Sequence, residues 1–208
     1  MSPIPINLAI EDDLSEAVLR RLISHADRGY AIGTAYGRTG YGYLKRTVGG
    51  WNRAAAGIPF VLLTDLDSYE CPMALIDDWL AVPKRPNLIF RVAVREVEAW
   101  LLADRTNFSR FLGIEESAMP PDVEGLNDPK ACVIGLARRT RSREIRERVA
   151  PPLGSTAKQG PDYNACLTGF VESIWNIPEA SARSVSLART VRRLGTFRPV
   201  WPAAAPQD

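Results

Sequence analysis

Two aspartates that follow a short apolar run, Asp65 and Asp67, have the clearest potential for chemistry in this chain. The run Val61 to Thr64 comes after Gly57 and Pro59, as is typical of a central strand in a parallel sheet. Ligands gather at the carboxyl ends of such strands. The run holds no arginine, so the two carboxylates would repel each other unless a divalent cation lay between them. The pattern therefore indicates either a metal site or an ordinary turn whose aspartates cap the next helix.

Two other apolar segments of the chain also end in acidic residues. Residues 5–10 lead into Glu11, and residues 87–94 lead into a segment that contains Glu96 and Glu98. In an alternating α/β chain with parallel strands, the carboxyl ends of the strands meet at one edge of the sheet. We therefore expect these acids to gather with the two aspartates, which favours a metal site over simple helix caps.

The surrounding pattern predicts an α/β fold with a mostly parallel sheet flanked by helices. A further strand is expected at residues 30–35, and the expected helices cover residues 14–26, 43–56, 72–80 and a segment that begins near residue 96. The prolines at 120, 121 and 129 predict a loop-rich stretch over residues 105–130, with mostly helical structure after it. The expected organisation is an α/β core over residues 1–104, a helical C-terminal extension packed on it over residues 105–200, and a disordered tail over residues 201–208.

Composition restricts the possible chemistry and setting. The 208 residues are 46% apolar, enough for one main core, and no apolar run reaches membrane-spanning length. Because the N-terminus also lacks the features of a signal peptide, we expect a cytoplasmic protein without a membrane partner. The three cysteines lack zinc-site spacing and are expected to be reduced thiols. A single histidine, His25, argues against histidine-based catalysis or metal binding.

Charge is distributed unevenly along the chain. Residues 1–130 carry 14 basic and 18 acidic side chains, a net charge of −4, whereas residues 131–198 carry 12 and 5, a net charge of +7. Arginine clusters suit phosphate backbones because the planar guanidinium binds two oxygens at once. The expected substrate-binding residues are Lys130, Arg138, Arg139, Arg141 and Arg143. Alternatively, the arginines form a solvated helix face paired with nearby glutamates, and Lys130 is an ordinary residue at a helix start.

The acidic motifs resemble those of the Toprim fold, which type IA and type II topoisomerases, bacterial primases and OLD-family nucleases share. The resemblance rests on Glu11 after the first strand, Asp65-Leu66-Asp67 after the third, and a glutamate in the run Arg-Glu-Val-Glu-Ala-Trp-Leu-Leu-Ala-Asp at residues 95–104. This run is similar to that of a bacterial Toprim-like family related to nucleases found with phage-defence ATPases. The resemblance covers about residues 4–104, with weaker echoes at residues 128–130 and at Tyr163.

The resemblance implies a Rossmann-like Toprim core and a Mg²⁺- or Mn²⁺-dependent nuclease, with phage defence as an expected setting. It assigns Glu11 as general acid or base and Asp65 and Asp67 as metal ligands. The third acid is either Glu98, which fits the related nucleases better, or Glu96, which is nearer to the strand end. The chain lacks the ATPase half of OLD proteins, so an ATPase partner is expected.

Two other functions remain open at this point. One is a non-catalytic module that binds a nucleic acid or a protein partner, and the other is a phosphatase that acts on a small phosphate ester. The basic C-terminal half favours nucleic acid over a small molecule, and it does not distinguish DNA from RNA.

Overall fold

A four-stranded, all-parallel sheet forms the centre of the computed structural model, which describes residues 2–201. The strand order is β2-β1-β3-β4, and the strands are β1 Ile4–Ile10, β2 Tyr30–Gly37, β3 Phe60–Asp65 and β4 Leu88–Ala93. The predicted α/β class and parallel sheet are confirmed, and the arrangement is consistent with a Rossmann-like fold.

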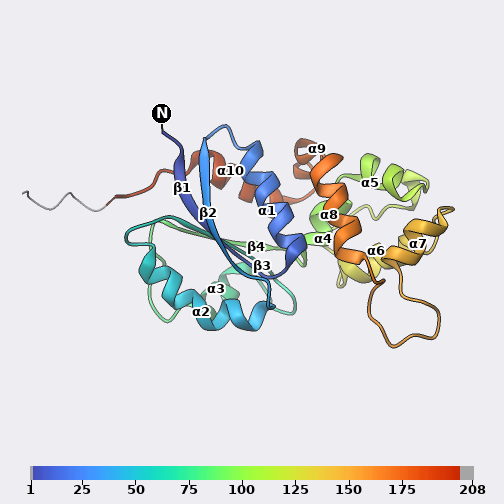
Figure 1. The fold of residues 1–208 in the computed structure, drawn as a ribbon, viewed down its shortest axis with the longest axis horizontal. Coiled ribbons are helices and arrows are strands. Elements are labelled where there is room, and N and C mark those ends of the chain that lie inside the picture. Colours follow the sequence, from blue (N-terminus) through green and yellow to red (C-terminus); the bar gives the residue numbers. More distant parts are fainter. Residues whose placement is uncertain (1, 202–208) are drawn as a thin grey trace, which may run out of the picture.

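Helices cover both faces of the sheet (Figure 1). Helices α1, Asp13–His25, and α10, Val185–Thr196, pack on one face, while α2, Tyr41–Ala54, and α3, Pro72–Trp79, pack on the other. The central strand β3 is therefore covered on both faces, and its successive residues are all buried up to Thr64. This double burial explains why β3 appears in the sequence as one continuous apolar run.

The remaining helices form an extension beside the carboxyl ends of the strands (Figure 1). They are α4 Val97–Ala103, α5 Arg105–Leu112, the 3₁₀ turn η1 Glu116–Ala118, α6 Pro129–Ala137, α7 Arg143–Val149, α8 Tyr163–Ser173 and α9 Ile177–Ser181. One hydrophobic cluster runs from the sheet into this extension through the buried Trp100. Across residues 2–201, no helix combines the length and apolar character needed to cross a bilayer.

The prediction of a loop-rich stretch over residues 105–130 was wrong at its start, where α5 forms. Asp104 accepts a hydrogen bond from the backbone N–H of Asn107 as an N-cap, and the helix ends at Gly113, whose φ of 67° suits glycine. The expected disordered tail after Trp201, residues 202–208, lies outside the described residues.

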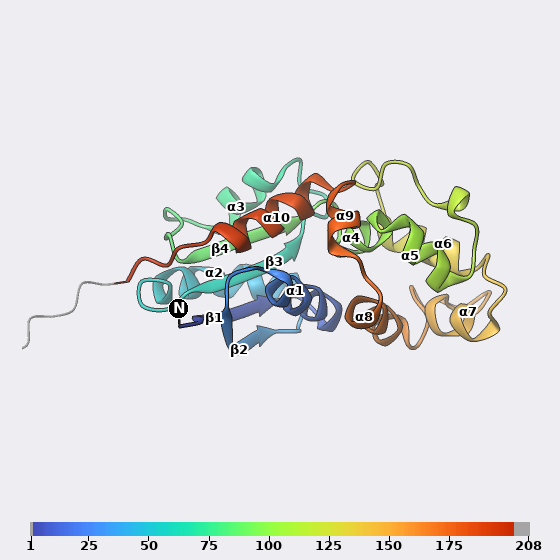
Figure 2. The same ribbon diagram turned by 90° about the horizontal axis from the view of Figure 1, so that it is seen from above.

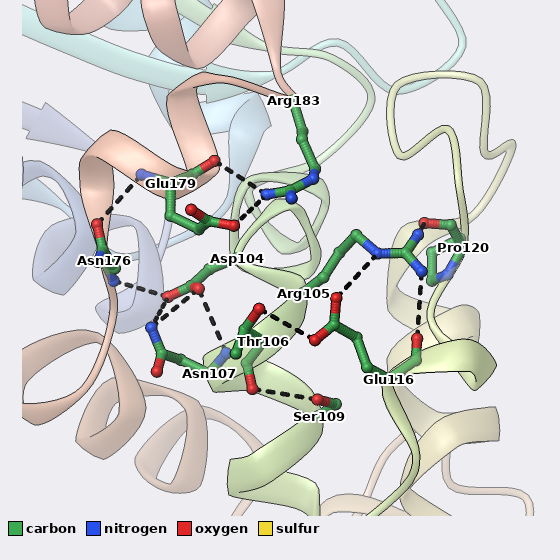
Figure 3. A network of polar contacts seen from close by, with 10 residues as sticks. All are labelled: Asp104, Arg105, Thr106, Asn107, Ser109, Glu116, Pro120, Asn176, Glu179 and Arg183. Carbon is green, nitrogen blue, oxygen red and sulfur yellow. Dashed lines mark hydrogen bonds and ion pairs between the residues drawn. The ribbon is translucent and has the colours of Figure 1, made fainter.

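Asp104 also joins distant parts of the extension, as Figure 3 shows. Its side chain is fully buried, and it accepts hydrogen bonds from Asn107 Nδ2 at 3.0 Å and from the backbone N–H of Asn176 at 2.7 Å. Asn176 in turn caps α9. The aspartate that closes the 95–104 run thus links α5 to α9, and its role is structural.

Candidate functional site at the carboxyl edge of the sheet

The central strands β1 and β3 bring Glu11 and the Asp65 segment to the same edge of the sheet. The two strands are paired in parallel through Ala9 and Leu62, so both chains leave the sheet in the same direction. The buried Thr64 hydroxyl then donates a hydrogen bond to Glu11 Oε2 at 3.2 Å. The carboxylate that follows β1 therefore lies against the end of β3.

Asp65 and Asp67 are held by the connection between β4 and α4. Asp65 Oδ1 accepts the backbone N–H of Val97 at 2.9 Å, at the start of α4. Asp67 has a φ of 48°, a left-handed conformation that aspartate tolerates better than most residues. Its backbone N–H donates to the carbonyl of Arg95 at 3.1 Å, and the Arg95 guanidinium donates back to the carbonyl of Asp67 at 3.1 Å. The turn between the two aspartates is thus fixed to the neighbouring strand end.

The two glutamates after β4 have different surroundings. Glu96 Oε2 accepts the backbone N–H of Lys130 at 2.8 Å, which docks the start of α6 against the site. Glu98 is 2% exposed, and its Oε1 accepts a hydrogen bond from the Tyr163 hydroxyl at 3.0 Å. Lys130 Nζ lies 3.6 Å from the same oxygen and 5.5 Å from the centre of the Tyr163 ring. The helical extension therefore completes the site.

Crowding of negative charge changes the ionisation of these acids. Burial and the charges of Glu98, Glu11 and Glu96 raise the pKa of Asp65 well above its usual range. Burial and Glu98 raise the pKa of Glu96 to about 7, and burial together with Asp67 raises the pKa of Glu11. These effects show that the acids influence one another and that the edge is short of positive charge.

Lys130 provides the positive charge that the structure places at this edge. Within residues 2–201, it is the only basic side chain that forms an ion pair with Glu11, Asp65, Asp67, Glu96 or Glu98. Although burial opposes its ionisation, Glu98 and Glu96 raise the pKa of the lysine, so it stays charged. Its side chain is 35% exposed, so the lysine that pairs with Glu98 is only partly buried.

The oxygen donors at this edge fit a hard divalent cation in kind, because Mg²⁺ and Mn²⁺ prefer carboxylates to nitrogen or sulfur ligands. Their present conformations are less suitable. Between residues 2 and 201, no three His, Cys, Asp or Glu side chains are arranged so that they could share one metal ion. Asp65 also uses one of its carboxylate oxygens to accept the Val97 N–H. Metal binding would thus require Glu11, Asp65 and Asp67 to turn toward a common point.

Two further residues belong to the surroundings of the site. Tyr163 contacts Glu98 directly, although the sequence indicated it only through a weak similarity to the Toprim-like family. The charge of Asp12 raises the pKa of both Glu11 and Glu98, while its carboxylate caps α1 by accepting the backbone N–H of Ser15 at 2.8 Å. The position of Asp12 directly after Glu11 was the available signal.

The four arginines predicted to bind substrate do not gather at this edge. Arg143 Nε forms an ion pair with Glu147 Oε1 at 2.7 Å on α7. Arg138 follows the end of α6, about 12 Å along the helix from Lys130 at 1.5 Å per residue. Arg139 and Arg141 line a separate pocket beside Glu115. Only Lys130 among the predicted substrate-binding residues contacts the acids.

Comparison with known proteins adds no relative: no family model matches the chain, and no curated protein or solved structure matches it.

Proposed function

We propose that this protein is a divalent-metal-dependent phosphodiester hydrolase that acts on nucleic acid, built on a Toprim-like variant of the Rossmann-like fold. The observation that carries the proposal is the gathering of Glu11, Asp65 and Glu98 at the carboxyl edge of a parallel sheet, with Lys130 paired to Glu98. Metal ions held by carboxylates can support cleavage of a phosphodiester without a histidine.

Asp65, Asp67 and Glu11 are the proposed ligands of Mg²⁺ or Mn²⁺. When bound, the metal neutralises charge on the attacked phosphate and on the departing oxygen. Glu11 is the proposed general acid or base, and burial together with Asp67 raises its pKa, which makes its carboxyl group easier to protonate. Either Glu96 or Glu98 is the third acid, and the contacts of Glu98 suit a residue that orients Lys130.

Lys130 is the proposed contact for a phosphate oxygen of the substrate. Its ammonium group is paired with Glu98, and the lysine side chain as a whole is partly exposed. A fixed positive charge at this position would stabilise negative charge as it develops on phosphate, without moving a proton. We further propose that the protein acts in phage defence together with an ATPase partner. Both points come from the resemblance to OLD-family nucleases.

The lack of a ready metal-binding group among the described residues favours a second candidate, a Toprim-like module that binds nucleic acid or a protein without cleaving it. The side chains as they stand do not form a shared metal-binding group within the described part of the chain. A module of this kind would keep the acids for recognition or for stability.

Metal-dependent cleavage distinguishes these possibilities. The purified protein should cleave single-stranded DNA, duplex DNA or RNA with Mg²⁺ or Mn²⁺ and not with EDTA. Asp65→Asn and Glu11→Gln should abolish cleavage and leave the fold intact. Asp13→Asn is the matched control, because Asp13 lies in the same acidic segment as Glu11 and its side chain is 74% exposed.

Absence of metal-dependent cleavage of every substrate, with and without an ATPase partner, would overturn the proposal in favour of the binding module. Turnover of a small phosphate monoester alone would instead identify a phosphatase.

A further inference from the structure

A second basic surface runs along α10 and β4, away from the arginines after residue 138. We define the α10 basic surface as Lys84, Arg91, Arg189, Arg192 and Arg193. Helix α10 lies lengthwise against β4, the edge strand of the sheet, as Figure 2 shows. The surface thus combines side chains from the last helix of the chain with side chains from a strand almost a hundred residues earlier.

Neutral groups hold three of the five side chains of this surface. Arg91 Nε donates to Thr190 Oγ1 at 3.1 Å, and Lys84 Nζ donates to the carbonyl of Leu88 at 3.1 Å. Arg193 donates to the carbonyl of Pro86 at 3.5 Å, and its guanidinium lies 5.2 Å from the centre of the Phe197 ring. These contacts anchor the side chains and leave their charge uncompensated.

No member of the α10 basic surface forms an ion pair with any residue in the range 2–201. By contrast, Arg148 lies 3.3 Å from Glu144 and 3.6 Å from Asp162, and Arg183 lies 2.5 Å from Glu179. Burial and the neighbouring Arg189, Arg193 and Arg192 lower the pKa of Arg91. The surface therefore concentrates like charges that an anion would stabilise.

One carboxylate lies near this surface and is already engaged. Glu124 lines the same cavity of about 370 Å³ as Arg91 and Arg189. Its Oε1 accepts hydrogen bonds from the Ser184 hydroxyl at 2.6 Å and from the backbone N–H of Ser186 at 2.7 Å. Glu124 thus binds the start of α10 through this oxygen, and it forms no ion pair with Arg91 or Arg189.

The α10 basic surface begins close to the acidic edge of the sheet. Ser186 Oγ accepts the backbone N–H of Val94 at 3.4 Å, two residues before Glu96. From there α10 runs antiparallel to β4, because Thr190 meets Arg91 and Arg193 meets Pro86. The rise from Ser186 to Arg193 is about 10 Å, which is comparable to the advance along a duplex axis over roughly three phosphates of one strand, at 3.4 Å each.

From this geometry we infer that the α10 basic surface binds the phosphate backbone of a nucleic acid whose adjoining segment lies at the acidic edge. The inference rests on the proposed function for the identity of the polymer. The guanidinium groups would contact phosphates and would position the strand without reading its sequence. DNA and RNA share this backbone chemistry, so the surface accepts either.

The test measures binding without cleavage. Fluorescence anisotropy of labelled duplex DNA and of labelled single-stranded RNA, each in EDTA, gives the dissociation constant at several salt concentrations. The test variant is Arg189→Ser/Arg192→Ser, because both side chains are exposed and hold no part of the core. The control is Arg148→Ser/Arg183→Ser, which removes the same charge from arginines that acidic residues already pair.

We expect the test variant to bind more weakly and with a flatter salt dependence. For two lost contacts at a slope of ~0.9 each, the weakening of duplex binding between 50 and 200 mM salt should shrink about 12-fold. The control should change little. An unchanged salt slope in the test variant, or an equal loss in the control, would overturn the inference.

Cleavage assays on the same proteins separate this inference from the proposed function. Wild-type protein that binds through Arg189 and Arg192 but never cleaves would refute the hydrolase and leave the binding surface in place. If Asp65→Asn abolishes cleavage but Arg189→Ser/Arg192→Ser leaves nucleic-acid binding unchanged, only the inference about the α10 basic surface is refuted.

Discussion

Tyr163 on α8 donates a hydrogen bond to Glu98 on α4 at 3.0 Å, across 65 positions of the chain. The helical extension thereby supplies a partner to an acid at the carboxyl edge of the sheet. The same glutamate lies 3.6 Å from Lys130 Nζ, so both contacts of Glu98 come from outside the α/β core. The extension is thus part of the site in addition to packing on the core.

Tyr163→Phe should lower the stability of the protein by about 1–3 kcal/mol, because a buried carboxylate loses a hydrogen-bond donor. Urea unfolding measures this loss. If Glu98 orients Lys130, the variant should also weaken metal-dependent cleavage while leaving the overall fold unchanged by circular dichroism. Unaltered stability would contradict the hydrogen bond to Glu98.

At alkaline pH, where Asp65 is ionised, Asp65→Asn should stabilise the metal-free protein, because it removes a buried charge that Glu98 and Glu11 repel while keeping an oxygen to accept the Val97 N–H. Each kcal/mol of repulsion removed should raise the melting temperature by about 2–4 °C for a chain of this size. Thermal unfolding in EDTA checks this.

Addition of Mg²⁺ provides the complementary measurement. Wild-type protein should gain thermal stability with Mg²⁺ concentration, because a ligand that binds only the folded state stabilises it. The gain should be absent from Asp65→Asn and present in the control Asp13→Asn. An equal gain in all three proteins would place metal binding away from Asp65.

Asp104→Ala should destabilise the protein by about 2–4 kcal/mol, because the backbone N–H of Asn176 and the Asn107 side chain lose their fully buried acceptor. Asp104→Asn should cost less, since it keeps one acceptor oxygen. Glu115→Ala, at an exposed position of the same extension, should stay within about 0.5 kcal/mol of wild type. Urea unfolding measures the free energy of unfolding of the three variants. Equal values for all three would contradict the structural role of Asp104.

Glu16 gives a prediction for acidic pH. Burial opposes its ionisation, but hydrogen bonds from Arg20 at 2.7 Å and Arg38 at 2.6 Å outweigh it and lower the pKa of Glu16 below 4.5. A lowered pKa in the folded state gives stability that is present above the unfolded value and lost as pH falls through the folded value. Glu16→Gln should therefore be less stable than wild type at pH 7, by a margin that shrinks below about pH 4.5. A margin independent of pH would contradict this ion-pair network.

The α/β class, the four strands and the approach of Glu11 to the Asp65 segment could be predicted from the sequence. Each depends on local signals: apolar runs for the strands, turn residues between them, and acids placed directly after strands. Parallel pairing then determines where the strand ends meet. The signals for α5 were also local, namely Asp104 before the helix and Gly113 after it, but the prolines further along outweighed them in the prediction.

The partners of the acids could not be predicted, because they come from contacts between distant segments. Nothing near Tyr163 in the sequence indicates that its hydroxyl reaches Glu98, and nothing near Arg189 indicates that α10 lies along β4. Arg143 shows the opposite case, because its ion pair with Glu147 lies within one helix. Pairing with a nearby glutamate was the alternative to substrate binding that the local sequence offered for this arginine.

The placement of α10 has a consequence for how the chain folds. This helix covers the face of β4 that carries Arg91, yet the whole helical extension is synthesised between the two. Bringing the two ends of so long a segment together is entropically costly and slows folding. The chain loses this entropy before the contacts between distant residues can stabilise it. During synthesis on the ribosome, β4 cannot be covered by α10 until the end of the chain emerges. During that interval its uncovered face and edge are open to aggregation or to a chaperone.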